Sequence, residues 1–170
     1  MKFKDIPKFT KTPIHKADVS IFDVKFHIEK YLNQYGLQLN PDFQRGHVWT
    51  EKQQIAYIEF ILKEGNSGRD IYFNHPGWLK DWKGEFVCVD GLQRLTAILK
   101  FTDNKLKVFG HYLQEFEGPI DWAGNCVRFY INDLKTKKEV LQWYLEMNYQ
   151  GTPHTNEELE RVKKLLEKEM

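Results

Sequence analysis

The sequence has few cysteines and no metal-binding pattern. Only two cysteines occur among 170 residues, Cys88 and Cys126, and both lie in apolar stretches that are typical of buried, reduced thiols. The six histidines include no pair at the H-x-x-x-H spacing of zinc enzymes. The sequence therefore predicts neither a disulfide framework nor a metal centre built from cysteine and histidine.

Long apolar runs are absent as well. No stretch approaches the length of a membrane span, and the N-terminus lacks the apolar segment of a signal peptide. We therefore expect a cytoplasmic protein with no membrane partner. A large excess of charge of one sign is also lacking, because 25 basic and 24 acidic residues leave a net charge of +1. This balance argues against a protein whose whole surface binds nucleic acid.

What the sequence does contain is a strong hydrophobic component. Hydrophobic residues make up 41% and aromatic residues 15%, which is typical of a folded chain rather than a disordered one. The length suits one domain with a real core, so we expect a single domain over residues 1–170. Within it we expect an extended basic arm over residues 1–19, with five lysines and one acid in its first sixteen positions, and C-terminal helices over residues 136–170.

Apolar periodicity and capping residues divide the chain into short strands and amphipathic helices. Three capping boxes, in which a threonine precedes a glutamine or glutamate by three positions, mark helix starts at Thr50, Thr136 and Thr155. Because short strands are mixed with helices, the predicted class is α+β. Helices are predicted from Ser20 or Asp18 to Gly36, from Thr50 to about Gly65, over 92–102, from Thr136 through Met147 and from Thr155 onward; strands are predicted over 71–73, 86–89, 105–112 and 125–131.

The run Asp90-Gly91-Leu92-Gln93-Arg94 lies where the buried strand 86–89 passes into the helix 92–102. Such a turn directs free backbone N–H groups at whatever lies above it, and Gly91 permits a close approach. Arg94 can form a fork onto phosphate or carboxylate, while Asp90 can orient water, act as a base or hold a divalent cation. A simple helix start explains the run equally well, with Asp90 as the capping residue and Arg94 paired to a nearby acid.

Two further segments carry polar side chains of a similar kind. Gln44 and Arg45 precede the second helix and suit phosphate oxygens or a base edge. Trp49 could stack on a base or serve as a core anchor. The connector from Asn148 to Thr152 could close over a ligand around the flexible Gly151, or could be an ordinary turn between helices.

These three segments occur in the order found in one family. They resemble the FQR-x-x-x-W, DGQQR-L-T and N-x-x-G-T-x-x-[ST]-x-x-E-L signatures of the DGQQR-containing family at the N-terminus of GmrSD-type type IV restriction enzymes, within the ParB/sulfiredoxin superfamily. The counterparts here are Phe43 to Arg45 with Trp49, Asp90 to Thr96, and Asn148 to Leu159. The resemblance spans roughly residues 20–164, which is nearly the whole chain.

The resemblance implies a ParB/sulfiredoxin-like α+β fold, in which helices surround a small mixed sheet and a helical pair ends the chain. It implies a polar pocket that binds and hydrolyses a nucleoside triphosphate with Mg²⁺, in DNA restriction, anti-restriction or DNA modification. DNA or a separately encoded nuclease or modification protein is the further partner. Asp90, Gln93 and Arg94 would form the reactive phosphate end, with Asp90 as the metal ligand. The residues implied around the rest of the nucleotide are Gln44, Arg45, Trp49, Gly91, Asn148, Gly151 and Thr152.

Two departures from the family pattern qualify these expectations. Leu92 replaces the first glutamine of DGQQR, so one amide is missing, and we expect phosphate binding more firmly than turnover. The length of the chain leaves no room for the C-terminal HNH-type nuclease domain of the GmrSD enzymes.

Other functions fit parts of the pattern. The pocket could contact a DNA backbone in a ParB-type binding module, or could transfer a phosphoryl group to a small molecule or modified base, as kinases do. Direct cleavage of nucleic acid ranks lower because no second acidic cluster accompanies Asp90 to hold two metals. The sulfiredoxin reaction is disfavoured because Cys88 precedes Asp90 on the strand. The sequence identifies neither the preferred base nor the oligomeric state.

Overall fold

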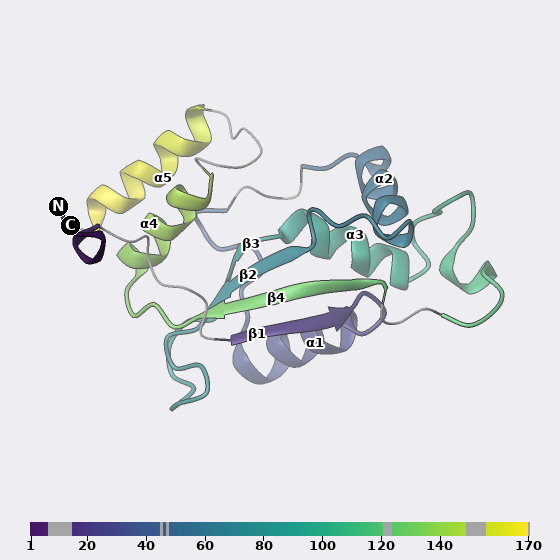
Figure 1. Cartoon of the computed structure of the whole chain (residues 1–170), viewed down its shortest axis with the longest axis horizontal. Coiled ribbons are helices and arrows are strands. Elements are labelled where there is room, and N and C mark those ends of the chain that lie inside the picture. The colour runs from purple at the N-terminus through teal and green to yellow at the C-terminus, as the bar shows by residue number, and fades with distance from the viewer. Residues whose placement is uncertain (7–14, 45, 47, 121–123, 149–155, 170) are drawn as a thin grey trace.

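The centre of the molecule is a four-stranded mixed sheet with the strand order β1-β4-β2-β3 (Figure 1). The first pair and the last pair of this order are antiparallel, whereas the middle pair, β4 and β2, is parallel. The strands are β1 (His15–Ser20), β2 (Asp70–Asn74), β3 (Val87–Asp90) and β4 (Cys126–Asn132). The computed structural model describes residues 1–6, 15–44, 46, 48–120, 124–148 and 156–169.

Helices lie on both sides of this sheet (Figure 1). The described residues form α1 (Val24–Tyr35), α2 (Glu51–Leu62), α3 (Leu92–Thr102), α4 (Lys137–Asn148) and α5 (Asn156–Lys168), with short 3₁₀ turns at Phe3–Asp5 and Leu113–Glu115. Strands and helices alternate irregularly along the chain, which confirms the predicted α+β class. None of the helices within the described ranges is long and apolar enough to cross a membrane.

Alternation along β2 and β3 divides the apolar side chains between two cores. Successive residues of a strand point to opposite faces of the sheet. Phe73 and Cys88 enter the first core, which also receives residues of α1, α2 and α3. Val87 and Val89 enter the second core, where α4 and α5 pack. Full burial of one such side chain stabilises the fold by about 1.5–3 kcal/mol, so both faces of β3 hold it in place.

Local sequence signals set the helix ends as predicted at several places. Gln53 N donates to Thr50 Oγ1 at 3.3 Å and Thr50 N donates to Gln53 Oε1 at 2.9 Å, which confirms the first capping box. Reciprocal bonds between Thr136 and Glu139, at 3.0 and 3.2 Å, confirm the second. The third box begins at Thr155, which lies outside the described residues.

The first helix begins later than predicted. Residues 15–20 form β1, and α1 begins only at Val24, so the predicted helix start at Ser20 or Asp18 was wrong. β1 pairs along its whole length with β4, a strand more than a hundred positions further along the chain, and local periodicity cannot reveal such a partner. β1 also occupies residues 15–19 of the predicted arm, while residues 7–14 lie outside the described residues.

The predicted strand over 105–112 was also wrong. One isolated bridge joins Val108 to His111, and the chain turns between them through Phe109 and Gly110, whose φ angles are 51° and 81°. Leu106 and Val108 are nevertheless buried in the first core. The apolar alternation that predicted a strand therefore places two side chains in the core without a pairing partner for a longer strand.

Candidate functional site

The Asp90–Arg94 turn lies at the C-terminal end of β3, where α3 begins. Gly91 has a φ of 113°, in the left-handed region that favours glycine. A Cβ added at Gly91 would lie 2.9 Å from Ile71 Cγ2, so the site also lacks space for a side chain. No side chain caps α3 at this end, hence Asp90 is not the capping group that one interpretation of the sequence expected.

Arg94 joins the ends of two neighbouring strands. Its Nη2 lies 3.2 Å from Asp90 Oδ2, and its Nη1 donates to the main-chain oxygen of Asp70, the first residue of β2. The pairing with a nearby acid that the sequence allowed is therefore present. The side chains of Arg94 and Asp90 remain 24% and 39% exposed, so both can still contact a ligand.

A polar cluster on β2 and β4 continues the site across the sheet. Asp70 Oδ1 lies 2.7 Å from Arg128 Nε, and the Tyr72 hydroxyl donates to Asp70 Oδ2 at 3.3 Å. Tyr72 also stacks on Tyr130, with ring centroids 5.0 Å apart. Burial, followed by the charge of Asp70, raises the pKa of Tyr72 to about 12, so its hydroxyl stays protonated and donates at neutral pH.

Sequence reasoning missed this cluster. The only signal is alternation, because Asp70 and Tyr72 alternate with the buried Ile71 and Phe73, as expected for a strand with one polar face. That pattern predicts a polar face but not its neighbour in space. The parallel pairing of β2 with β4, which places Tyr72 opposite Tyr130, is visible only in the folded structure.

Gln44, a predicted nucleotide-binding residue, is buried and bonded to the backbone. Its Nε2 donates to the main-chain oxygens of Cys88 at 3.0 Å and Val89 at 2.8 Å. Its own main-chain oxygen accepts from Arg161 of α5 at 2.8 Å. Gln44 thus fixes the segment before α2 against β3 on one side and α5 on the other.

Gln93 holds the same segment from α3. Its Oε1 accepts from the backbone N–H groups of Val48 and Trp49, both at 3.0 Å, and its Nε2 donates to the main-chain oxygen of Gly46 at 3.0 Å. Gln93 was predicted to lie at the reactive phosphate end, but its amide oxygen already accepts two hydrogen bonds within the protein. One Nε2 hydrogen is left for a further contact.

Of the remaining predicted residues, only Trp49 and Asn148 lie within the described ranges. Trp49 is half-buried, packs against the first core and contacts the ring of Tyr57 at 5.3 Å, as expected of a core anchor. Asn148 is the last residue of α4. Arg45, Gly151 and Thr152 lie outside the described residues. The structure therefore brings together Asp90, Gly91, Gln93, Arg94, Gln44 and Trp49.

Asp90, the one acid of this turn, suits a metal ion that is held mainly by the phosphate oxygens of a nucleotide. Among the described residues, no three His, Cys, Asp or Glu side chains lie close enough to hold a metal by themselves. Asp90 nevertheless has one carboxylate oxygen beyond the one that Arg94 contacts. Mg²⁺ commonly takes one or two carboxylates and completes its shell with phosphate oxygens and water. Asp90 therefore fits the role of a single protein ligand to a nucleotide-bound Mg²⁺.

Cys88 is placed away from any such chemistry. Its side chain lies fully buried in the first core, and burial raises the pKa of its thiol. The thiolate is the reactive form of cysteine, so burial disfavours nucleophilic chemistry at this residue.

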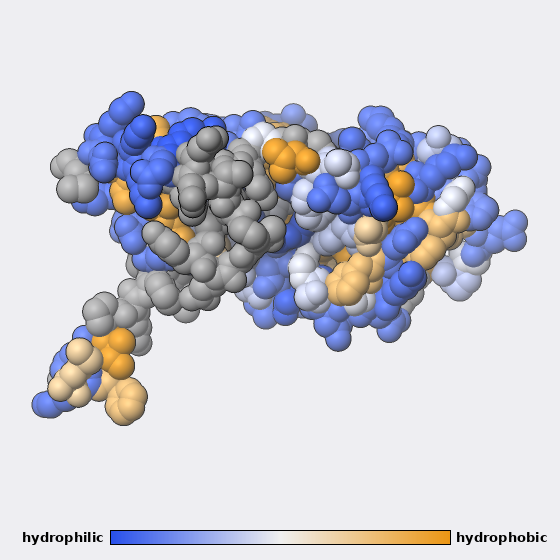
Figure 2. All heavy atoms as spheres, turned by 90° about the horizontal axis from the view of Figure 1, so that it is seen from above, coloured by the Kyte–Doolittle hydropathy of each residue, from blue (hydrophilic) through white to orange (hydrophobic). Residues whose placement is uncertain are grey.

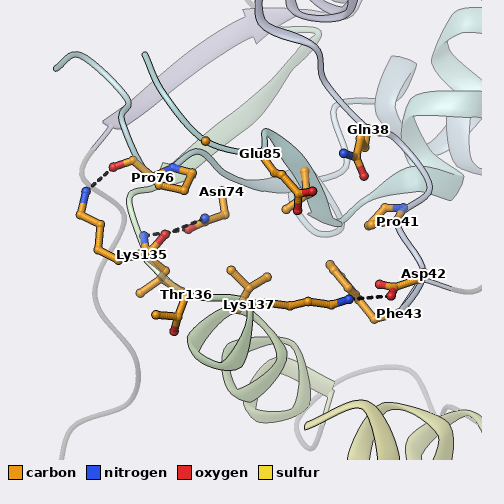
Figure 3. A pocket seen from close by; sticks show the side chains of 14 residues that line it. Gln38, Pro41, Asp42, Phe43, Asn74, Pro76, Glu85, Lys135, Thr136 and Lys137 are labelled. Atoms are coloured by element: carbon orange, nitrogen blue, oxygen red, sulfur yellow. Dashed lines mark hydrogen bonds and ion pairs between the residues drawn. The ribbon is translucent and has the colours of Figure 1, made fainter. Parts of the chain in front are cut away.

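A separate cavity of about 470 Å³ lies between the start of α4 and the N-terminal end of β3 (Figure 3). None of the predicted site residues lines it. Lys137 extends along one side of the cavity to Asp42, with 2.6 Å between Nζ and Oδ2, and Lys135 Nζ donates to the main-chain oxygen of Pro76. Its two lysines thus already have partners within the protein.

Another cavity, of about 410 Å³, is mainly apolar. It lies where the end of α2 meets the segment 113–120, and apolar side chains gather at this end of the molecule in the view from above (Figure 2). Its described lining contains one acid, Glu117, and no cationic side chain, so the cavity does not suit a phosphate.

Comparison with known proteins agrees with the motifs of the site. The model of the family described as "GmrSD restriction endonuclease, N-terminal domain" matches residues 28–122, more than half of the chain. The matched stretch contains Gln44, Trp49 and the Asp90–Arg94 turn, and it ends before Arg128. Searches of curated proteins and of solved structures found no match. This chain therefore belongs to the family of the GmrSD restriction endonuclease N-terminal domain.

Proposed function

We propose that this protein binds a nucleoside triphosphate with Mg²⁺ at the Asp90–Arg94 turn and acts in DNA restriction, anti-restriction or DNA modification. Family membership connects the chain with restriction systems. The single observation that supports nucleotide binding is the pairing of a half-exposed acid and a guanidinium at a strand-to-helix turn whose helix start has no side-chain cap. Such a turn offers free N–H groups and a positive partial charge to phosphate oxygens.

Arg94 is the main phosphate-binding residue in this proposal. A guanidinium carries five N–H donors, and two of its nitrogens already contact Asp70 and Asp90, which fixes its orientation. The remaining donors can meet phosphate oxygens without a further loss of side-chain freedom. Pre-ordering of this kind lowers the entropic cost of binding.

Asp90 carries the chemistry that would follow binding. Its free carboxylate oxygen can hold Mg²⁺ beside the phosphates or orient a water for in-line attack on the terminal phosphorus. Leu92, at the start of α3, offers an apolar side chain in place of an amide, so the reactive phosphate end has one polar group fewer than the family motif. Hydrolysis is thus the second part of the proposal, and phosphate release by the wild type tests it directly.

Isothermal titration with each of the four common ribonucleoside triphosphates and Mg²⁺ tests the binding step. We expect the wild type to bind at least one of them, and Arg94→Ala to bind it about 10–100-fold more weakly, because a charge-assisted hydrogen bond contributes about 1.5–3 kcal/mol. Lys30→Ala, which removes an exposed cation on α1, is the matched control and should bind like the wild type. Absence of heat with every nucleotide would contradict the proposal.

A further inference from the structure

We propose that Arg128 is a second phosphate-binding residue of the same site, and that Asp70 positions both guanidiniums for a ligand with two or more phosphate groups. The inference rests on the proposed function and extends it. Asp70 lies between Arg94, which donates to its main-chain oxygen, and Arg128, whose Nε lies 2.7 Å from its carboxylate. One residue of β2 thus orients guanidiniums from α3 and from β4.

Arg128 has donors to spare. Its side chain is 38% exposed, and within the described ranges only its Nε has a partner, the carboxylate of Asp70. Arg128 lines an open depression of about 630 Å³, whose lining also includes Arg69 and the acids Asp18 and Glu64. Its guanidinium is therefore held at one edge and can bind oxygen atoms at the other.

Arg69 lines the same depression, and comparison of the two arginines shows what a structural guanidinium looks like here. Arg69 donates to four main-chain oxygens, at distances of 2.6–3.1 Å, and so joins the end of α2 to the start of β4. The Arg69 guanidinium therefore serves to hold the backbone together. Arg128 makes no such set of bonds among the described residues, so its free donors are not required by the backbone.

The charge balance favours a polyphosphate over a monophosphate. Asp70 and Asp90 are each paired with one arginine, so the four side chains together are neutral before a ligand arrives. The Tyr72 hydroxyl also donates to the second oxygen of Asp70, at 3.3 Å, and so helps to hold this carboxylate in place beside Arg128. A phosphate chain that brings its own Mg²⁺ can place one group on Arg94 and the next on Arg128.

The test is the dependence of affinity on phosphate number. Wild type, Arg128→Gln and the control Lys30→Ala are titrated with the mono-, di- and triphosphates of adenosine, guanosine, cytidine and uridine in the presence of Mg²⁺. We expect Arg128→Gln to weaken di- and triphosphate binding about tenfold or more, while monophosphate binding changes less than about threefold. Asp70→Asn removes the carboxylate beside Arg128 but keeps the main-chain oxygen that accepts from Arg94, so it should also weaken di- and triphosphate binding more than monophosphate binding.

Three outcomes would overturn the inference. If the wild type binds a nucleoside triphosphate and Arg128→Gln binds it equally well, Arg128 is not a phosphate ligand and the proposed function stands. If Arg128→Gln lowers the melting temperature and weakens mono- and triphosphate binding equally, the role of Arg128 is structural. If the wild type binds no nucleotide, the proposed function and the inference fail together.

Discussion

At the scale of single residues, Gly91 sets the shape of the site. Its positive φ allows the chain to leave β3 and enter α3 within one residue, and the absence of a Cβ leaves Ile71 undisturbed. Only then do the Asp90 and Arg94 side chains, four positions apart, meet at 3.2 Å. The contact between Asp90 and Arg94 therefore depends on the backbone conformation of Gly91.

Gly91→Ala should destabilise the protein for two separate reasons. The left-handed backbone costs about 1–2 kcal/mol for a residue with a Cβ, and overlap with Ile71 adds about 1–3 kcal/mol. Gly110→Ala is a matched control, because Gly110 has a φ of 81° but nothing within 4 Å of the added Cβ. Urea unfolding of both variants measures the difference. Equal losses of stability would show that the contact with Ile71 contributes nothing.

At the scale of elements, the segment before α2 is fastened by side chains that sequence reasoning had assigned to the ligand. Gln44 binds β3, and Gln93 binds the backbone of Gly46, Val48 and Trp49. Arg161 of α5, which was not a predicted site residue, donates to the main-chain oxygen of Gln44. An amide is suited to this task because it donates and accepts at once. In this structure Gln44 and Gln93 hold the segment before α2 in place beside the Asp90–Arg94 turn.

Gln93→Ala should therefore loosen the segment before α2 and affect the sheet less. We expect faster hydrogen exchange at the Val48 and Trp49 amides, and a loss of about 1–3 kcal/mol in the free energy of unfolding, because their shared acceptor is removed. Gln142→Ala, which removes one exposed bond to Glu146 on α4, is the control and should leave both amides unchanged. Unaltered exchange at Val48 and Trp49 in Gln93→Ala would show that Gln93 does not hold the segment before α2.

At the scale of the whole molecule, sequence patterns predicted single helices and strands better than they predicted which strands pair with one another. The helix 92–102, the caps at Thr50 and Thr136 and the α+β class follow from local rules, and the structure confirms them. The pairing of β4 with β1 and β2 does not follow from local rules, because it depends on long-range sheet closure. In the same way, β2 lies beside β3 only in the folded sheet, so sequence patterns could not place Asp70 near the Asp90–Arg94 turn.

The predicted site was recovered to different degrees for the same physical reason. Asp90 to Arg94 form one continuous turn, so sequence alone could place them together. Asp70, Tyr72 and Arg128 come from two other strands and had no motif to mark them. The placement of the chain in the ParB/sulfiredoxin superfamily and the roles of Arg45, Gly151 and Thr152 stay predictions.

The central claim is that a nucleoside triphosphate binds at the Asp90–Arg94 turn. Amide NMR spectra of the uniformly ¹⁵N-labelled wild type, recorded during titration with each nucleoside triphosphate and Mg²⁺, test it most directly. We expect the largest shifts at the amides of Gly91, Leu92 and Gln93, because their N–H groups open α3 without a side-chain cap. Shifts confined to the cavity beside Lys135 and Lys137, or no shifts with any nucleotide, would contradict the account.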